Sequence, residues 1–254
     1  MQPEFLRQQD LLIPGQLRDE NIDIVGAGSL GGAILLALCK MGCGIENRVT
    51  VTDFDTCKIH NLPTQWFRSS HAKTNWPKVH ALAEAVELLC ERRIETQLGR
   101  FSGAEERPLG PVLILAVDSI EERTRIWKNV KVRSDVRFLL DARMGAEVVE
   151  IRAVVLGRDA HDVYEESLHD PAQSFAEPCT RRAIVYTSLG AAGFVASLFR
   201  SYARGLPFPR YVAFDFRNFF LETSPLPAVP RAAGRPRPRR RPSKENPARA
   251  GSSA

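Results

Sequence analysis

Gly26, Gly28 and Gly31 have the Gly-x-Gly-x-x-Gly spacing that brings backbone close to the phosphates of a nucleotide. The β-rich segment Asn21–Val25 precedes them, and Leu30–Cys43 is rich in Ala and Leu, as in a buried helix. A strand, a tight turn and a helix in this order direct the free N–H groups of the helix start at an anion. We expect Gly26 to permit the turn, Gly28 to admit the phosphates and Gly31 to allow close packing of the helix on the strand.

Carboxylates follow two further buried segments. The expected strand Arg48–Thr52 ends at Asp53, whose carboxylate is suited to accept hydrogen bonds from ribose hydroxyls. The run Val112–Val117 ends at Asp118, where an oxygen ligand could hold Mg²⁺ against phosphates or cap the helix expected over Glu121–Val132. The glycines and Asp53 fit NAD and ATP equally well.

Lys78 begins the amphipathic helix expected over Lys78–Arg93, directly after Pro77. A cation does not complement the positive end of a helix. This conflict favours a role for the Lys78 ammonium in binding phosphates, and the alternative is a solvated surface lysine.

Together these motifs resemble the ubiquitin-activating-enzyme-like adenylyltransferases of the ThiF, MoeB and HesA type, over Arg7 to about Ala203. The matching residues, in order, are Arg7-Gln8, the three glycines, Asp53 and Asp55, Asn61-Leu62 with Gln65, Lys78, and Asp118 followed by Thr124-Arg125. The resemblance implies that Asp53 holds ribose, that Asn61 and Lys78 hold phosphates, and that Asp118 holds magnesium. It also implies a homodimer in which Arg7 reaches the nucleotide of the neighbouring subunit.

The implied reaction is activation of a carboxylate by ATP. In the family the carboxy terminus of a small ubiquitin-like or sulfur-carrier protein attacks the α-phosphate, giving an acyl-adenylate and pyrophosphate. Cys179 lies where the family has a cysteine that can capture the acyl group, and Arg181 and Arg182 would favour its thiolate. The alternative for Cys179 is ordinary packing under a loop.

Thr64 departs from the family, which has arginine at this place before Gln65. A threonine carries no charge to stabilise a developing negative charge, and Arg68 is a candidate replacement. Thr64 also raises the alternative of a nucleotide-binding scaffold without catalysis. A further alternative, an NAD(P)-dependent oxidoreductase, leaves Asn61, Lys78 and the other motif residues unexplained.

The remaining cysteines, Cys39, Cys43, Cys57 and Cys90, form no Cys-x-x-Cys pair, so we expect no zinc site. Cys39 and Cys43 are four apart and are typical of helix packing. Free thiols and the lack of a leader pattern predict a cytoplasmic location. The nearly uncharged stretch Ala183–Phe199 is short for a membrane span and is expected to be a buried helix, with no membrane association.

These patterns predict an α/β fold: a Rossmann-like, mostly parallel sheet with helices on both faces, extended by antiparallel strands, over residues 1–224. Further strands are expected at Ile94–Phe101, Arg137–Asp141, Glu147–Val155 and, at the edge, Tyr211–Leu221. Arg143, after the second of these, would face the crevice or form a surface ion pair. Asp159–His169 would be a short helix or loop over the site, and its two histidines lack metal-ligand spacing.

Residues 225–254 form a basic tail rich in proline. The tail carries a balance of +7, which leaves −2 on the rest of a chain whose formal net charge is +5. With few apolar residues it is expected to be disordered. Nucleic acid binding is possible through this tail only, and the alternative is a dispensable solvated extension.

Overall fold

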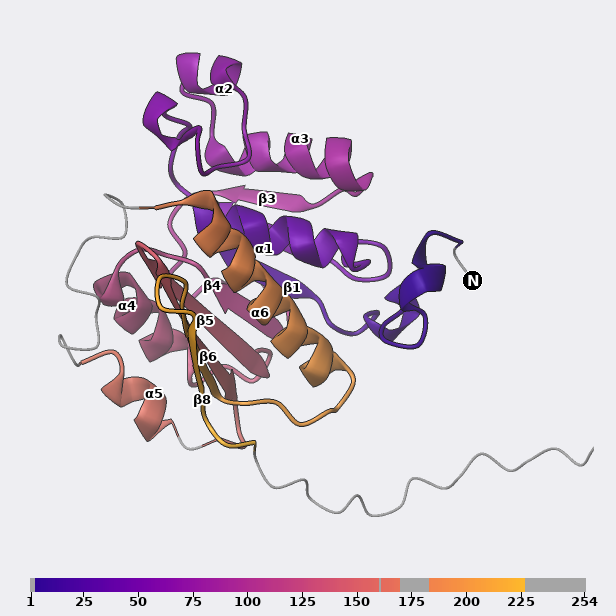
Figure 1. The fold of residues 1–254 in the computed structure, drawn as a ribbon, viewed down its shortest axis with the longest axis vertical. Helices are drawn as coiled ribbons and strands as arrows, with labels where there is room; N and C mark the ends of the chain where they lie inside the picture. Colours follow the sequence, from indigo (N-terminus) through magenta and orange to yellow (C-terminus); the bar gives the residue numbers. More distant parts are fainter. Residues whose placement is uncertain (1–2, 160, 170–182, 227–254) are drawn as a thin grey trace, which may run out of the picture.

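The computed structural model describes residues 3–159, 161–169 and 183–226 (Figure 1). Its strands form one sheet in the order β3-β2-β1-β4-β5-β6-β7-β8. The strands are β1 (Ile22–Val25), β2 (Val49–Asp53), β3 (Glu95–Leu98), β4 (Val112–Leu115), β5 (Phe138–Gly145), β6 (Val148–Val155), β7 (Tyr211–Asp215) and β8 (Phe220–Thr223). Strands β1 to β5 are mutually parallel, and β6, β7 and β8 add in antiparallel fashion. The predicted mixed α/β sheet is therefore confirmed.

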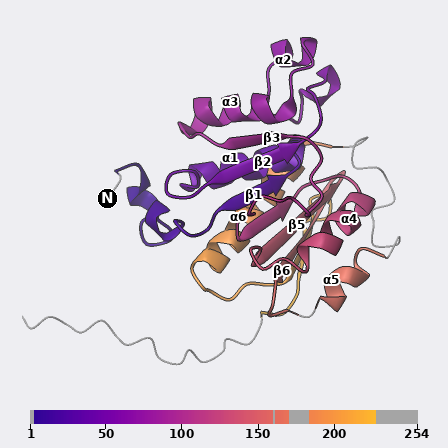
Figure 2. The same ribbon diagram turned by 180° about the vertical axis from the view of Figure 1, so that it is seen from behind.

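Helices cover both faces of the sheet. The α-helices are α1 (Ser29–Lys40), α2 (Ser69–Lys73), α3 (Lys78–Cys90), α4 (Ile120–Val130), α5 (Asp162–Glu166) and α6 (Val185–Ala203), and the 3-10 turns are η1 (Pro3–Gln8), η2 (Pro14–Gln16) and η3 (Ile59–Asn61). Figure 1 shows α1 and α6 crossing in front of the sheet, and Figure 2, from behind, shows α4 and α5 on the opposite face. α3 belongs with α1 and α6, because their buried side chains share one apolar cluster.

The central strands are apolar on both faces because each face is covered by a helix. Ile24 packs into the cluster under α1 and α6, whereas its neighbour Val25 packs with Ile126 and Trp127 of α4. This alternation follows from the two-residue repeat of a strand. Burial on both sides fixes the positions of the carboxyl ends of β1 and β4.

The connections place a crevice at those carboxyl ends. β1 pairs with β2 on one side and with β4 on the other, so the chain changes direction across the sheet at β1. In doubly wound sheets ligands bind at this switch point, just beyond the strand ends.

Two strand predictions are wrong in their boundaries. β5 continues to Gly145, so Asp141 and Arg143 lie inside a strand, because β6 pairs with the whole segment. The segment expected as one edge strand, Tyr211–Leu221, is a hairpin of β7 and β8, and β8 is the edge. The Asp215 carboxylate accepts the N–H groups of Arg217 and Asn218, which stabilises the turn between them.

The stretch expected as a buried helix corresponds to α6, which packs against α1 and the sheet. No helix in the described ranges is long and apolar enough to cross a membrane. The prediction that Cys39 and Cys43 pack in the core is confirmed, since both are buried, but only Cys39 lies on α1, which ends at Lys40. Burial raises the pKa of the Cys39 thiol to about 12, so it stays protonated at neutral pH.

Candidate functional site

A cleft of about 870 Å³ lies at the carboxyl ends of β1, β2 and β4. The cleft brings together residues from the glycine turn, from the end of β2, from η3, from the start of α3 and from the loop before α4. The predicted site residues that line it are Gly26, Gly28, Asp53, Asp55, Asn61, Gln65, Lys78 and Asp118. Residues that are up to about ninety positions apart in the sequence therefore line the same cleft.

The glycine turn is packed too tightly for side chains at two positions. Gly26 has φ +104°, and a Cβ there would lie 2.5 Å from the Ala116 carbonyl oxygen. A Cβ on Gly31 would lie 1.9 Å from the carbonyl oxygen of Gly26, so the close approach at Gly31 is to the turn itself. Gly28 is the N-cap of α1, and the space beside its Cα is open. The first N–H groups of α1 therefore face the cleft without a side chain in the way.

The Asp53 carboxylate braces this turn. It accepts the N–H of Ala27 at 2.6 Å and the N–H of Asp55 at 2.7 Å. A carboxylate has about four acceptor positions, so it retains capacity for ribose hydroxyls. The bracing contact joins the ends of β1 and β2, and nothing in the local sequence of either strand predicts it.

Lys78 and Asp55 form an ion pair on the cleft wall. The Lys78 Nζ lies 2.7 Å from the Asp55 carboxylate, and the Lys78 side chain is 11% exposed. The backbone N–H of Lys78 also donates to the Asp55 carbonyl at 2.9 Å. Asp55 therefore holds the ammonium in the cleft, a role that the sequence analysis did not assign to it.

Three buried polar atoms on the cleft wall lack hydrogen-bond partners within the described part of the chain. They are Ser29 Oγ, Thr52 Oγ1 and Gln65 Oε1. Buried polar groups in folded proteins are nearly always paired, so such a cluster favours a polar ligand at this place. Ser29 and Thr52 were missed by the sequence analysis, although each directly neighbours a motif residue.

Asp118 lines the cleft, two residues after Ala116, whose carbonyl lies against Gly26 of the glycine turn. Ser119, and not Asp118, caps α4, because the Ser119 Oγ accepts the N–H of Glu122. The interpretation of Asp118 as a helix cap is therefore wrong. Mg²⁺ is commonly held by one or two carboxylates together with phosphates and water, and the Asp118 carboxylate fits a magnesium ion that arrives with a nucleotide. The described residues contain no group of three or more His, Cys, Asp or Glu placed to bind a metal by themselves.

A buried ionic network supports the loop before Asp118. Arg123 donates to the Asp141 carboxylate at 2.7 Å and to the Val117 carbonyl oxygen at 2.5 Å. Arg143 also binds Asp141, at 2.8 Å, and is buried. The expectation that Arg143 faces the crevice or forms a surface ion pair is wrong. Arg143 lies within β5, and its buried guanidinium contacts Ser167 at the end of α5. Burial alone would raise the pKa of Asp141, but the two guanidinium groups outweigh it and lower that pKa.

Thr64 lines the cleft, as its motif position requires, but Arg68 does not replace the missing arginine in this structure. The Arg68 guanidinium lies 2.7 Å from Glu84, and its side chain is 71% exposed. It is not among the described residues that line the cleft. Other cations do line it, namely Lys58, Arg100 and Arg125. Of these, only Arg125 was named from the sequence, as a residue of the family pattern and without a site role.

Arg7 lies on η1, away from the cleft of its own chain. The neighbouring Gln8 donates to the carbonyl of Met41, at the carboxyl end of α1. α1 has 12 residues, and at 1.5 Å per residue it separates η1 from the glycine turn by about 18 Å. In Figure 1 the indigo segment that carries η1 lies beside the carboxyl end of α1. Cys179, with Arg181 and Arg182, falls outside the described residues.

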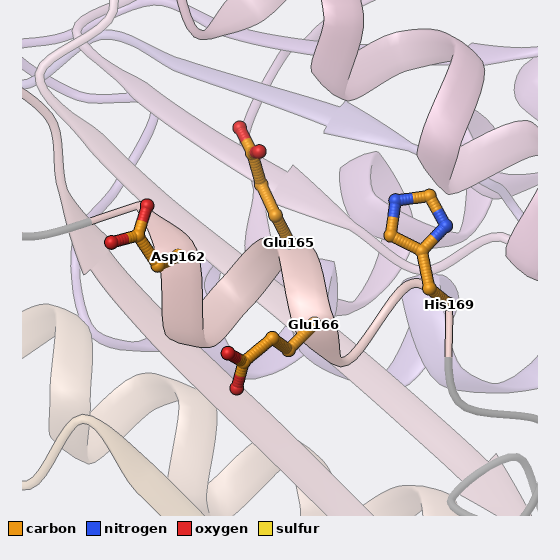
Figure 3. Close-up of a pocket in the computed structure, with 4 residues that line it drawn as sticks. All are labelled: Asp162, Glu165, Glu166 and His169. Atoms are coloured by element: carbon orange, nitrogen blue, oxygen red, sulfur yellow. The ribbon is translucent and has the colours of Figure 1, made fainter.

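A second pocket, of about 500 Å³, lies beside α5 and is drawn in Figure 3. Asp162, Glu165, Glu166 and His169 line it. Their side chains point in different directions, so they do not converge on one ligand. The Glu165 carboxylate instead accepts the indole N–H of Trp127 at 3.0 Å. Glu165 thus contributes to holding α5 against α4.

Residues 12–132 match the model of the ThiF family, and no curated protein matches the chain. Escherichia coli MccB solved with ATP has a TM-score of 0.65 at 12% identity, with 92% of this chain and 73% of that chain covered. E. coli MccB solved with AMPCPP and MccA has a TM-score of 0.65 at 13% identity, with 90% of this chain and 73% of that chain covered. PaaA has a TM-score of 0.64 at 15% identity, with 82% of this chain and 64% of that chain covered. This chain thus spans roughly two thirds to three quarters of those proteins, and at such identities the likeness shows a shared fold. The predicted resemblance to the ThiF family is confirmed by the match over residues 12–132.

Proposed function

We propose that this protein binds ATP with Mg²⁺ and adenylates the C-terminal carboxylate of a small protein or peptide. The main support for this proposal is the cleft, which the glycine turn, Asp53, Lys78 and Asp118 all line. Its wall also carries the three buried polar atoms that lack hydrogen-bond partners among the described residues. The match of residues 12–132 to the ThiF family model supports the proposal. The similar protein MccB has been solved with ATP and with N-formylated MccA.

The chain would act mainly by positioning and by neutralising charge, as nucleotidyl transfers require. The N–H groups at the start of α1, the Lys78 ammonium and Asn61 would bind the phosphates, and Asp53 would orient the ribose. Asp118 would hold Mg²⁺, which offsets phosphate charge. A carboxylate oxygen then forms a bond to the α-phosphorus while the bond to pyrophosphate breaks, leaving an acyl-adenylate.

The substrate carboxylate in this proposal belongs to a ubiquitin-like or sulfur-carrier protein, as the family resemblance implies, or to a shorter peptide. Cys179 is proposed to receive the acyl group. Residues 225–254 are proposed to be a basic tail that can contact nucleic acid. Removal of this tail after Ser224 is expected to leave adenylation unchanged, since it contributes none of the cleft residues named above.

A homodimer is part of the proposal because the cleft lacks the Arg7 of its own chain. Arg7 is exposed and lies at the far end of α1. A second copy could present this guanidinium to the phosphates from outside the cleft. The exposed apolar residues Leu6 and Leu11 flank Arg7 and would suit such a contact.

A second candidate function is a nucleotide-binding protein without turnover. Thr64 on the cleft wall and the pairing of Arg68 with Glu84 favour it, since together they leave the position before Gln65 without a cation. An oxidoreductase is favoured less, because a dinucleotide would leave the clustered Asn61 and Lys78 without a role.

Exchange of labelled pyrophosphate into ATP tests the proposal. We expect exchange when the full chain is mixed with a candidate carrier protein ending in glycine, and no exchange without that carrier. A chain that binds ATP but supports no exchange with any carrier or peptide carboxylate would favour the second candidate. Exchange that persists in Lys78→Met would contradict the assigned phosphate contacts.

A further inference from the structure

The loop between β2 and α3 carries three of the cleft residues. Asn61, Thr64 and Gln65 line the cleft, and they lie between β2, which ends at Asp53, and α3, which begins at Lys78. The Asn61 carbonyl accepts the backbone N–H groups of Thr64 and Gln65 at 3.1 and 3.0 Å. The three residues therefore form one compact turn, and its place in the cleft depends on what holds the loop.

Trp66, directly after Gln65, anchors this turn to α1. A Cβ on Gly32 would lie 2.9 Å from the Trp66 Cδ1, so the indole lies against bare backbone of α1. The Gly32 N–H donates to the Gly28 carbonyl at 2.9 Å, which places this contact in the first turn of α1. The indole therefore fixes the loop beside the N–H groups that face the cleft.

A second anchor joins α2 to α3, which lie beside each other in Figures 1 and 2. The Arg68 Nη2 and the His71 Nε2 lie 2.7 and 3.1 Å from the same carboxylate oxygen of Glu84. The Arg68 backbone N–H, 3.4 Å from the His71 Nδ1, can only donate, so Nδ1 accepts and Nε2 carries the hydrogen that Glu84 accepts. The imidazole, 8% exposed, thus uses both ring nitrogens to join the start of α2 to α3.

The two anchors connect the loop to the two helices whose starts would bind phosphates. α1 would offer its first N–H groups, and α3 would offer the Lys78 ammonium. Trp66, His71 and Glu84 are not among the described residues that line the cleft. They can therefore act on a ligand only by fixing groups that touch it. Groups that are fixed before the ligand arrives lose less entropy on binding, and a misplacement of about 1 Å weakens their contacts.

We propose that Trp66, His71 and Glu84 are positioning residues for the phosphates of the nucleotide. They hold Asn61 and Gln65 in place relative to the starts of α1 and α3, and so set the affinity for ATP without touching it. This inference rests on the proposed function, because it takes from it the phosphate contacts of Asn61 and Lys78. It adds that the affinity is controlled from the outer side of α3.

A matched pair of substitutions on α3 tests the inference. Glu84→Ala releases the anchor, whereas Glu87→Ala removes a carboxylate whose partner Arg93, at 3.6 Å, is 92% exposed. Both variants lose one negative charge and gain the best helix former, so both should fold. By charge alone each would bind a polyanion slightly more tightly. In calorimetry with ATP and Mg²⁺ we expect Glu84→Ala to bind roughly 3- to 10-fold more weakly. Glu87→Ala should stay within roughly 2-fold of the wild type.

Variants of His71 separate positioning from a general loss of structure. His71→Gln keeps an N–H that can reach Glu84, so it should bind ATP nearly as the wild type does. His71→Ala should behave like Glu84→Ala, and the two together should weaken binding no further, because they break the same anchor.

If the wild type binds ATP and Glu84→Ala binds it equally well, the inference fails alone. Tighter binding by Glu84→Ala would also overturn it, because the released Arg68 would then contribute a contact instead of the loop losing one. If the wild type binds no ATP, the proposed function fails with it.

Discussion

Replacing Arg123 with methionine removes the centre of the buried ionic network beneath the cleft. Arg123 is 3% exposed on α4 and donates to Asp141, to the Val117 carbonyl and, at 3.1 Å, to the Ala142 carbonyl. Methionine fills a similar volume but donates nothing. The Asp141 carboxylate, which is completely buried, would keep only Arg143 and the Tyr164 hydroxyl of its present partners.

Breaking one side of a buried ion pair costs about 3–5 kcal/mol of unfolding free energy. Because Arg143 and Tyr164 still contact Asp141, we expect Arg123→Met to lie near the lower end, about 3 kcal/mol. For a protein of this size that loss lowers Tm by about 6–12 °C. The exposed pair of Arg18 and Glu46, with Arg18 70% exposed, supplies the control: Arg18→Met should cost less than about 1 kcal/mol.

The pH dependence follows from the lowered pKa of Asp141. A carboxylate with a depressed pKa in the folded state stabilises the protein above its unfolded pKa, and this contribution is lost as pH falls toward the folded value. The difference in unfolding free energy between the wild type and Arg123→Met should therefore have its full value at about pH 7 and become smaller below about pH 4. Urea unfolding followed by circular dichroism at both pH values measures it. A loss of unfolding free energy below about 1 kcal/mol at neutral pH would show that Arg123 does not stabilise the buried Asp141 carboxylate.

Three further substitutions test the cleft. Gly31→Ala places a Cβ against the carbonyl oxygen of Gly26 and should lower stability by about 1–3 kcal/mol and abolish ATP binding; unchanged binding in calorimetry would contradict the packing. Lys78→Met removes a charged contact to phosphate and should raise the Kd for ATP by roughly 10- to 100-fold, whereas an unchanged Kd would place the ammonium outside the binding site. Mixing inactive Arg7→Ala with inactive Lys78→Met should restore part of the pyrophosphate exchange if Arg7 acts across a dimer, and no recovery would argue against that arrangement.

Features with a local signal could be predicted from the sequence. The glycine spacing, the apolar runs and the carboxylates at strand ends are each read within a few residues, and parallel strands bring their carboxyl ends to one edge. This explains why Asp53, Asn61, Lys78 and Asp118 were found before the fold was known. The same reasoning gave the antiparallel pairing of β6.

Features that depend on contacts between distant elements could not be predicted. Arg123 and Arg143 meet at Asp141 only because β5 continues beyond that residue under α4 and α5, and an exposed charge is the usual fate of each residue type. The pairing of Asp55 with Lys78 also needs the loop between β2 and α3 to fold back. The stacking of Arg100 on Phe54 depends on β3 lying beside β2, which sequence patterns alone do not reveal.

Calorimetric titration of the full chain with ATP and Mg²⁺, and in parallel with NAD, tests whether the cleft binds ATP. We expect saturable binding of ATP and none of NAD, with ATP binding weakened by Lys78→Met. Binding of NAD with no response to ATP would contradict it.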